Sequence, residues 1–318
     1  MISTLHHRLP VAGTTTFLLF LVAFPWLAAL FGQEFYIEFG SRLLIIALVA
    51  SSLNLILGFG GLVSLGHAAY FGAGAYVVGI LMHYGVTSAW IAWPAAVATG
   101  AILALIFGAI SLRTRGVYFI MITLAFAQMT YYIFVSMRTY GGDDGLPLPQ
   151  KSQLGIDLNN EITFYYVVLA LGAVCMLAML RLINSRFGRV LQAAKENETR
   201  MGAIGFSVYR YRLVCFVIAG AIAALGGALF ANLNMMASPS QLNWVQSGTL
   251  MVMVIVGGIG HFFGGLIGAF LLLILEEILS GYTTHWALPV GFVLLAIVLF
   301  LPNGVASLFR PKTSQGDA

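Results

Sequence analysis

The stretch GFGGLVSLGHAAYFGAGAY, residues 58–76, combines many glycines with one histidine and no charged residue. Glycine-rich loops can cradle phosphate, so a nucleotide site is the first chemistry to test. Such a loop needs a lysine directly after a glycine, and no Gly-Lys pair occurs anywhere in the chain. The sequence therefore predicts that this chain does not hydrolyse ATP. Two interpretations remain for the stretch, which are a close-packing seam between helices and a broken element beside a transport path.

Glycine most often serves close packing in membrane helices, because small residues let two backbones approach. The predicted packing or hinge positions are Gly58, Gly60, Gly61, Ser64, Gly66, Gly72, Gly74, Gly257, Gly258, Gly260, Gly264 and Gly268. The last three recur every four residues, so we expect one ridge on a helix. The Ser64 hydroxyl is expected to cap a helix beginning near Leu65. A helix end within the membrane could also hold a carboxylate.

Polar residues inside apolar segments cost free energy in lipid unless they face protein or water. Notable among those of this chain are Asn54, His67, Thr123, Gln128 and Asn232. They are candidates for lining a path, and plain hydrogen bonds between helices are the alternative; for His67 a packing role is favoured. No group of residues has metal-ligand spacing, and no nucleophile has a paired base. We therefore predict no metal, no bound cofactor and no catalytic residue.

The composition indicates what must position these residues. Of 318 residues, 60% are hydrophobic and only 8% are charged, whereas soluble domains carry about 25% charged residues. The prediction is an all-α polytopic membrane protein that forms one domain over residues 1–318. About ten runs approach the ~20 apolar residues of a membrane span, with the third and eighth short or re-entrant. They are Gly13–Phe31, Leu43–Phe59, Leu65–Met82, Trp90–Leu112, Val117–Met137, Ile162–Leu182, Tyr211–Leu233, Trp244–Ile259, Phe262–Leu279 and His285–Leu301.

Basic residues predict the orientation, since Lys and Arg concentrate in short cytoplasmic loops. If both termini are cytoplasmic, twelve of the fifteen Lys and Arg lie on the cytoplasmic side, and only Arg42, Arg138 and Lys151 lie on the outer side of the membrane. The basic residues are thinly spread, so no surface for nucleic acid is predicted. Two segments are long enough to matter for function, the outer loop 138–161 and the cytoplasmic loop 183–210. In the latter, Val190, Ala194, Met201 and Ile204 are expected on one face of a short helix.

The pattern fits two interpretations of that loop, a helix that lies on the bilayer surface and a docking element for a cytoplasmic partner. A resemblance to a known family favours docking. The run GRVLQAAKENETRMGAIGFSVYRYRL resembles the cytoplasmic loop of the permease subunits of branched-chain amino acid ABC importers. Its matching positions are Gly188, Arg189, Leu191, Ala193, Glu196, Asn197, Glu198, Ala203 and Gly205. The blocks Leu53–Tyr76, Val256–Leu279 and Leu301–Leu308 are similar to other parts of the same family. Relatives often carry proline where Gly265 stands.

The resemblance implies a permease of the bacterial inner membrane that forms a transport path with a second, homologous permease. Two cytoplasmic ATPase subunits would use the ATP, and a periplasmic or extracellular solute-binding protein would deliver the solute. Branched-chain amino acids are the expected substrates, with urea, amides and aromatic acids as alternatives. An ion-coupled secondary transporter normally needs an acidic or histidine relay within the membrane, whereas the acidic residues here cluster at the surfaces. A membrane enzyme would need a catalytic constellation, which the sequence lacks.

Overall fold

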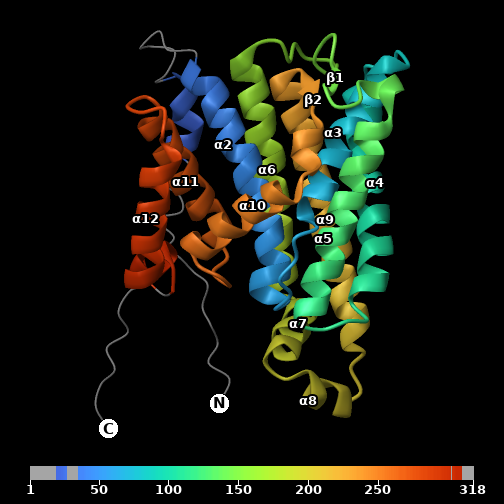
Figure 1. Cartoon of the computed structure of the whole chain (residues 1–318), viewed down its shortest axis with the longest axis vertical. Coiled ribbons are helices and arrows are strands. Elements are labelled where there is room, and N and C mark those ends of the chain that lie inside the picture. Colours follow the sequence, from blue (N-terminus) through green and yellow to red (C-terminus); the bar gives the residue numbers. More distant parts are fainter. Residues whose placement is uncertain (1–18, 27–34, 302, 310–318) are drawn as a thin grey trace.

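The computed structural model describes residues 19–26, 35–301 and 303–309, and the part it describes is a bundle of helices (Figure 1). The α-helices are α2 (Phe35–Asn54), α3 (His67–His83), α4 (Ala89–Ser111), α5 (Val117–Ser136), α6 (Glu161–Asn184), α7 (Arg186–Glu196), α8 (Glu198–Ala203), α9 (Val208–Asn234), α10 (Trp244–Gly257), α11 (Gly264–Ser280) and α12 (Ala287–Phe300). The π-helix η1 (Leu55–Phe59) continues α2, and η2 (Arg138–Tyr140), η3 (Pro239–Leu242) and η4 (Val305–Phe309) are short 3₁₀ helices. Strands β1 (Leu146–Pro147) and β2 (Met236–Ala237) pair antiparallel.

Five helical segments are long and apolar enough to cross a bilayer. They are Phe35–Phe59, α4, α5, α6 and α9, with 20 to 27 residues each. At 1.5 Å per residue these lengths match about 30 Å of hydrocarbon. The prediction of an all-α polytopic membrane protein is therefore confirmed. Of the predicted span Gly13–Phe31, residues 19–26 are helical and the rest lies outside the described residues.

The remaining helices of the bundle are shorter, and the third and eighth predicted spans are among them. Helix α3 has 17 residues and α10 has 14. Helix α2, in contrast, begins at Phe35 and not at Leu43. Its first turn carries Glu38, whose negative charge is favoured at a helix N-terminus, so the helix extends beyond its purely apolar part.

Helix α9 forms the centre of the bundle and packs on α2, α3 and α4. Small residues allow the contact with α3, because a Cβ on Gly74 would meet the carbonyl of Ala224 and a Cβ on Gly227 would meet that of Phe71. Gly220 packs against the Cβ atom of Ala104 in α4, and a Cβ on Gly100 of α4 would meet the carbonyl of Gly220. The three helices can therefore approach at backbone distance, as glycine and alanine permit in membrane proteins.

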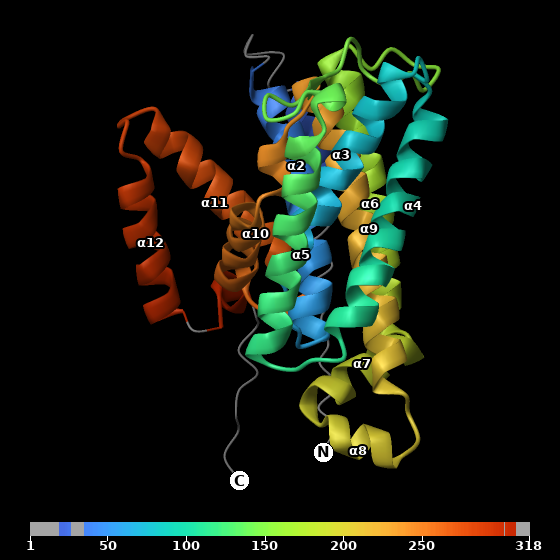
Figure 2. The same cartoon turned by 45° about the vertical axis from the view of Figure 1, so that its right-hand side comes forward.

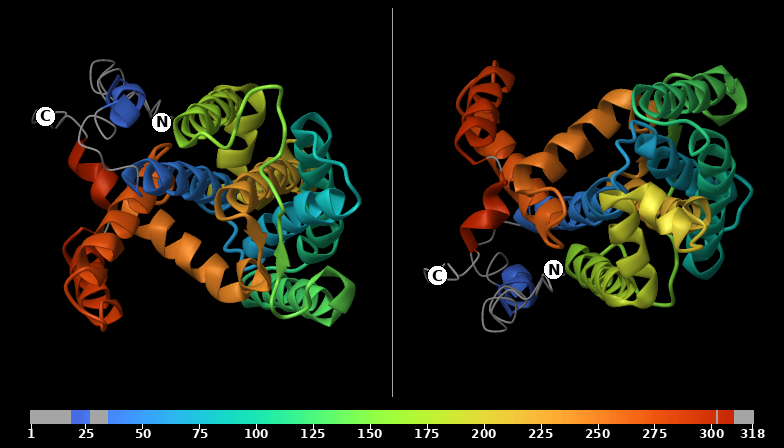
Figure 3. Two further views of the ribbon diagram at one scale, coloured as in Figure 1. Left: turned by 90° about the horizontal axis from the view of Figure 1, so that it is seen from above. Right: turned by 90° about the horizontal axis from the view of Figure 1, so that it is seen from below.

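Helices α11 and α12 lie to one side of the bundle, both in the side view (Figure 2) and in the views from above and below (Figure 3). Helix α11 contacts α10 through Gly264 and Gly268, where an added Cβ would meet backbone atoms of Gly258 and Met253. The predicted ridge of three glycines is wrong in one respect. Gly260 lies in the connection before α11, with a φ of +80°, and the helix begins only at Gly264.

The two long loops lie at opposite ends of the bundle. Helices α7 and α8 form one end, and β1, β2 and the loop 138–161 lie at the other (Figure 1). This arrangement agrees with the alternation of the predicted spans. We continue to call the α7 end cytoplasmic as a prediction from the basic residues.

Candidate functional site

Helix α3 begins inside the bundle. Its first residue, His67, is fully buried, and its Nε2 atom lies 2.8 Å from the Ser52 hydroxyl of α2. Ser52 precedes the helix end at Phe59 by seven residues, which corresponds to about 10 Å along the axis. The chain therefore leaves the end of α2, turns back through residues 60–66 and starts α3 well above that end.

Side-chain hydroxyls satisfy the backbone donors at this start. The N–H groups of Leu65, Gly66 and Ala68 donate to the hydroxyls of Thr123 at 3.2 Å, Ser64 at 3.2 Å and Ser247 at 2.8 Å. The predicted Ser64 cap is wrong, because α3 starts at His67 and Ser64 closes the turn before it. The capping oxygen comes from Ser247 on α10. Because these three donors have acceptors within the chain, they offer no free place for a carboxylate.

Helix α10 meets α3 at this point with its own N-terminus. Ser247 lies in the first turn of α10, and the Asn243 side chain accepts the N–H of Val245 at 3.1 Å. With 14 residues, α10 is about 21 Å long and too short to cross the hydrocarbon alone. Helix α3 starts at a buried residue and α10 starts beside it, part-way along the bundle. Such short helices resemble the discontinuous helices at the core of many transporters.

Most of the candidate path residues hold the fold together. Asn54, His67, Thr123 and Asn232 are at most 1% exposed, and each has a hydrogen-bond partner within the chain. Asn232 accepts the N–H of Ser152 at 2.7 Å and so fixes the loop 138–161. For these four, the alternative of hydrogen bonds between elements describes the structure. Gln128 differs, because its buried Oε1 atom has no partner in the described structure.

The loop 183–210 folds into two helices and not one. Helix α7 ends at Glu196, and Asn197 adopts an extended conformation with φ −153° and ψ 98°. Its Oδ1 atom accepts the N–H of Arg200 at 2.8 Å and so starts α8. Val190, Ala194 and Met201 pack together as expected, whereas Ile204 is 64% exposed. Asn197 breaks the helix, and Ile204 follows the end of α8 at Ala203, so it does not share the packed face.

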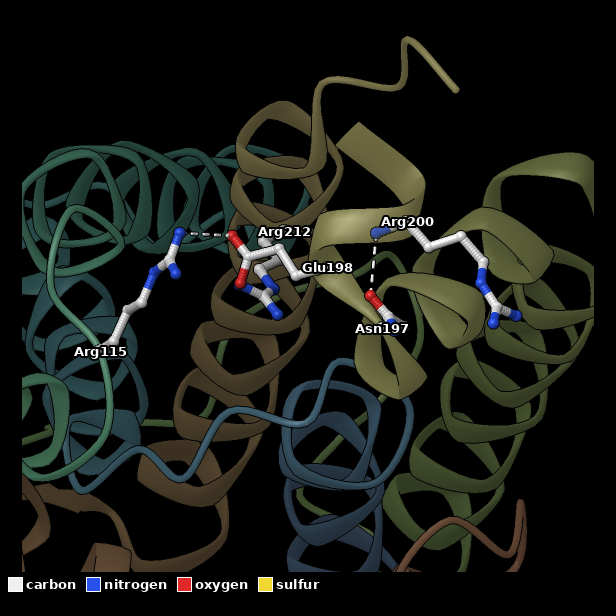
Figure 4. A network of polar contacts seen from close by, with 5 residues as sticks. All are labelled: Arg115, Asn197, Glu198, Arg200 and Arg212. Atoms are coloured by element: carbon white, nitrogen blue, oxygen red, sulfur yellow. Dashed lines mark hydrogen bonds and ion pairs between the residues drawn. The ribbon is translucent and has the colours of Figure 1, made fainter. Parts of the chain in front are cut away.

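Glu198 ties α8 to the bundle. Its carboxylate oxygens lie 3.1 Å from Arg115, in the connection between α4 and α5, and 3.0 Å from Arg212 at the start of α9 (Figure 4). Glu196 and Arg189 are exposed, whereas Gly188 and Leu191 are buried and Ala193 is half-buried. The motif therefore divides into residues that hold the loop and residues that face outward. Gly205 adopts a φ of +94°, which glycine tolerates best.

Lys195 links this loop to the glycine-rich stretch. Its Nζ atom donates to the carbonyl of Gly58 at 2.7 Å. Sequence reasoning missed this residue and also Ser247, because their partners are backbone groups far away in the chain. The only signal for Lys195 was its position next to the motif residue Glu196.

The opposite end of the bundle carries a small charged hollow of about 220 Å³. Its lining residues are Glu38, Ser41, Lys151, Glu161, Phe164 and Leu233. The Lys151 ammonium lies 4.8 Å from the ring centre of Phe164, and partial burial lowers its pKa despite the nearby acidic residues. Among the described residues, no group of three His, Cys, Asp or Glu could hold a metal ion. This hollow is separate from the loop 183–210 at the other end.

Comparisons with known proteins match almost the whole chain. Residues 36–301 match the family model described as branched-chain amino acid transport system / permease component. The permease LivM of Salmonella typhimurium is 25% identical, with 89% of this chain and 73% of that protein covered. The permease LivH of the same organism is 26% identical over 85% of this chain and 92% of that protein. A probable LivM permease of Methanocaldococcus jannaschii is 26% identical, covering 81% and 89%. No solved structure matches.

Proposed function

Because this chain belongs to the family of branched-chain amino acid transport system permease components, we propose that it is the membrane subunit of an ATP-driven importer. It pairs with a second, homologous permease, and two separate ATPase subunits act on the loop 183–210. A solute-binding protein delivers the solute at the opposite end of the bundle. The proposed location is the bacterial inner membrane.

The shape of the loop 183–210 is the observation that carries this proposal. Helices α7 and α8 form a compact unit below the bundle, with a small apolar cluster that Val208 of α9 completes. Glu198 joins this unit to Arg115 and Arg212, which belong to two other segments. A force applied to the unit would therefore reach several helices at once. The exposed Glu196 and Arg189 remain available to a partner on its outer side.

Alternating access needs a part of the bundle that can rearrange without exposing backbone groups to lipid. The start of α3 meets this need, because hydroxyls from α5 and α10 and the local Ser64 satisfy its donors. A hydroxyl can exchange one partner for another at low cost in free energy. We propose that α3 and α10 shift against each other here during transport, and that Gln128 lines the path.

The substrate class follows from the relatives and is part of the proposal. The curated relatives are named as branched-chain amino acid permeases. Leucine, isoleucine and valine are the first solutes to test. Urea, amides and aromatic acids are the alternatives, and the accompanying solute-binding protein would discriminate among them.

A bulky residue on the outward side of the loop should block the ATPase subunits. Gly205→Trp would also strain the backbone, because Gly205 has a φ of +94°. Gly202→Trp avoids this problem, since Gly202 lies in α8 and an added Cβ meets nothing within 4 Å. We expect Gly202→Trp to reduce copurification of the ATPase subunits by about tenfold or more, a loss of at least ~1.4 kcal/mol of binding free energy. Glu196→Ala should weaken copurification less, because it removes one exposed contact.

The matched control is Asn159→Trp, which places the same side chain on an exposed residue at the opposite end. It should leave copurification unchanged. Copurification that is equal for wild type, Gly202→Trp and Glu196→Ala would contradict docking at this loop.

A further inference from the structure

The contact between Lys195 and the glycine-rich stretch is close and has two parts. The Nζ atom donates to the Gly58 carbonyl at 2.7 Å. The aliphatic stem covers Gly61, where an added Cβ would lie 2.7 Å from the lysine Cγ. Gly61 has a φ of +69°, the left-handed conformation that ends a helix. Lys195 therefore contacts both a carbonyl near the end of η1 and the turn that follows.

A second connection meets the first at Gly58. A Cβ on Gly58 would lie 2.6 Å from the backbone nitrogen of Gly260, in the connection between α10 and α11. Asn54 joins the two, because its Nδ2 atom donates to the His261 carbonyl at 2.7 Å and its Oδ1 atom accepts the Gly260 N–H at 3.3 Å. Three segments that are distant in sequence thus converge at Gly58. They are the end of α7, the chain between α2 and α3, and the chain between α10 and α11.

These two connections adjoin α3 and α10, the helices that contact each other through Ala68 and Ser247. Residues 60–66 run from η1 to α3, and residues 258–263 follow α10. Helix α2 continues into the π-helix η1, a rare form that occurs mostly as single turns within α-helices and frequently at functional sites. A displacement of Gly58 would therefore act on α3 from one side and on α10 from the other.

We propose that Lys195 is a positioning residue that transmits movement of the loop 183–210 to α3 and α10 through Gly58. The inference rests on the proposed function, because it names the residue through which the ATPase subunits would act. A hydrogen bond from a charged donor is directional and stronger than a neutral one. It can therefore hold Gly58 to α7 when the loop 183–210 moves away from the bundle as well as toward it. A cation is also favoured beside the C-terminal carbonyls of a helix.

A purely local role would have a different consequence. A lysine that only stabilises the end of α2 would, when replaced, lower the amount of folded complex. It would leave the number of solute molecules moved per ATP unchanged. The stoichiometry of transport therefore separates transmission from stabilisation.

The test compares Lys195→Met with wild type in the complete transporter, purified with its second permease and ATPase subunits and reconstituted in liposomes. Methionine retains an apolar stem over Gly61 and removes the charged donor. We expect ATP hydrolysis to stay within about twofold and leucine uptake per ATP to fall about tenfold, as expected for the loss of a charged hydrogen bond. Lys195→Arg retains a donor and should recover at least half of the wild-type ratio.

Arg113→Met is the matched control, because Arg113 is an exposed cation in the connection between α4 and α5. It should keep the wild-type ratio. An unchanged ratio in Lys195→Met, measured on folded complex, would overturn the proposal. So would an equal loss in Lys195→Arg. If wild type shows no ATP-dependent uptake at all, the proposed function fails instead, and the two failures are distinguishable.

Discussion

Replacement of Gly227 by valine is expected to prevent stable folding of this protein. A Cβ at Gly227 would overlap the backbone carbonyl of Phe71, so α3 and α9 would have to separate. Because the overlapping atoms belong to the backbone, no flexible side chain can move aside to relieve the overlap. We therefore expect a loss of more than ~4 kcal/mol in unfolding free energy. The measurement is the yield of monodisperse protein after extraction in detergent, together with its thermal unfolding midpoint.

The control for this prediction is Gly172→Val in α6. There an added Cβ meets nothing within 4 Å, so the same change of residue creates no overlap. Gly172→Val should keep a yield and midpoint close to wild type. Equal behaviour of the two variants would contradict the close approach of α3 and α9.

The second large effect is expected at Asn54. Asn54→Leu retains a similar side-chain volume but removes the hydrogen bonds to Gly260 and His261. Two partly buried backbone groups lose their partner, each at a cost in the lower part of the range of about 1–3 kcal/mol, so we expect a loss of ~2–4 kcal/mol in unfolding free energy. The thermal unfolding midpoint in detergent should fall clearly. The connection between α10 and α11 should also become more accessible to protease.

Asn234→Leu provides the comparison, because Asn234 is exposed and bonds only to Phe230 within its own helix. This variant should change the midpoint by far less. If Asn54→Leu leaves both the midpoint and the protease pattern unchanged, Asn54 does not join the two connections.

The long helices could be predicted because a continuous apolar run has few other options in a bilayer. The run Trp90–Leu112 corresponds to α4 at Ala89–Ser111, and Val117–Met137 corresponds to α5 at Val117–Ser136. Hydropathy decides these elements locally, since about 20 apolar residues must pair their own backbone groups. The polar loop 183–210 was recognisable for the same reason, as the one long interruption on its side of the bundle.

The start of α3 could not be predicted, because its donors bond to residues far away in the chain. Ser247 supplies the oxygen for Ala68 across 179 positions, and Thr123 supplies that for Leu65 across 58. A local rule placed the cap at Ser64, which is the nearest hydroxyl. Ser247 caps α3 in place of Ser64 because the chain between α2 and α3 turns back into the bundle, where α10 is close.

The partners of Asn54 and Lys195 were hidden for a related reason. Both residues bond to backbone groups, and the sequence does not mark a carbonyl as special. An asparagine in an apolar helix indicated a polar contact, but path lining and helix joining fit the pattern equally well. Only the fold shows that Asn54 faces the connection at Gly260 and His261.

The most direct test of the proposed function is leucine uptake into liposomes that contain the complete complex, with the solute-binding protein outside and ATP inside. We expect uptake that requires both ATP and the binding protein. Collapse of proton and sodium gradients with ionophores should not reduce it. Uptake that persists without ATP and stops when the gradients are collapsed would contradict ATP-driven import and identify an ion-coupled transporter.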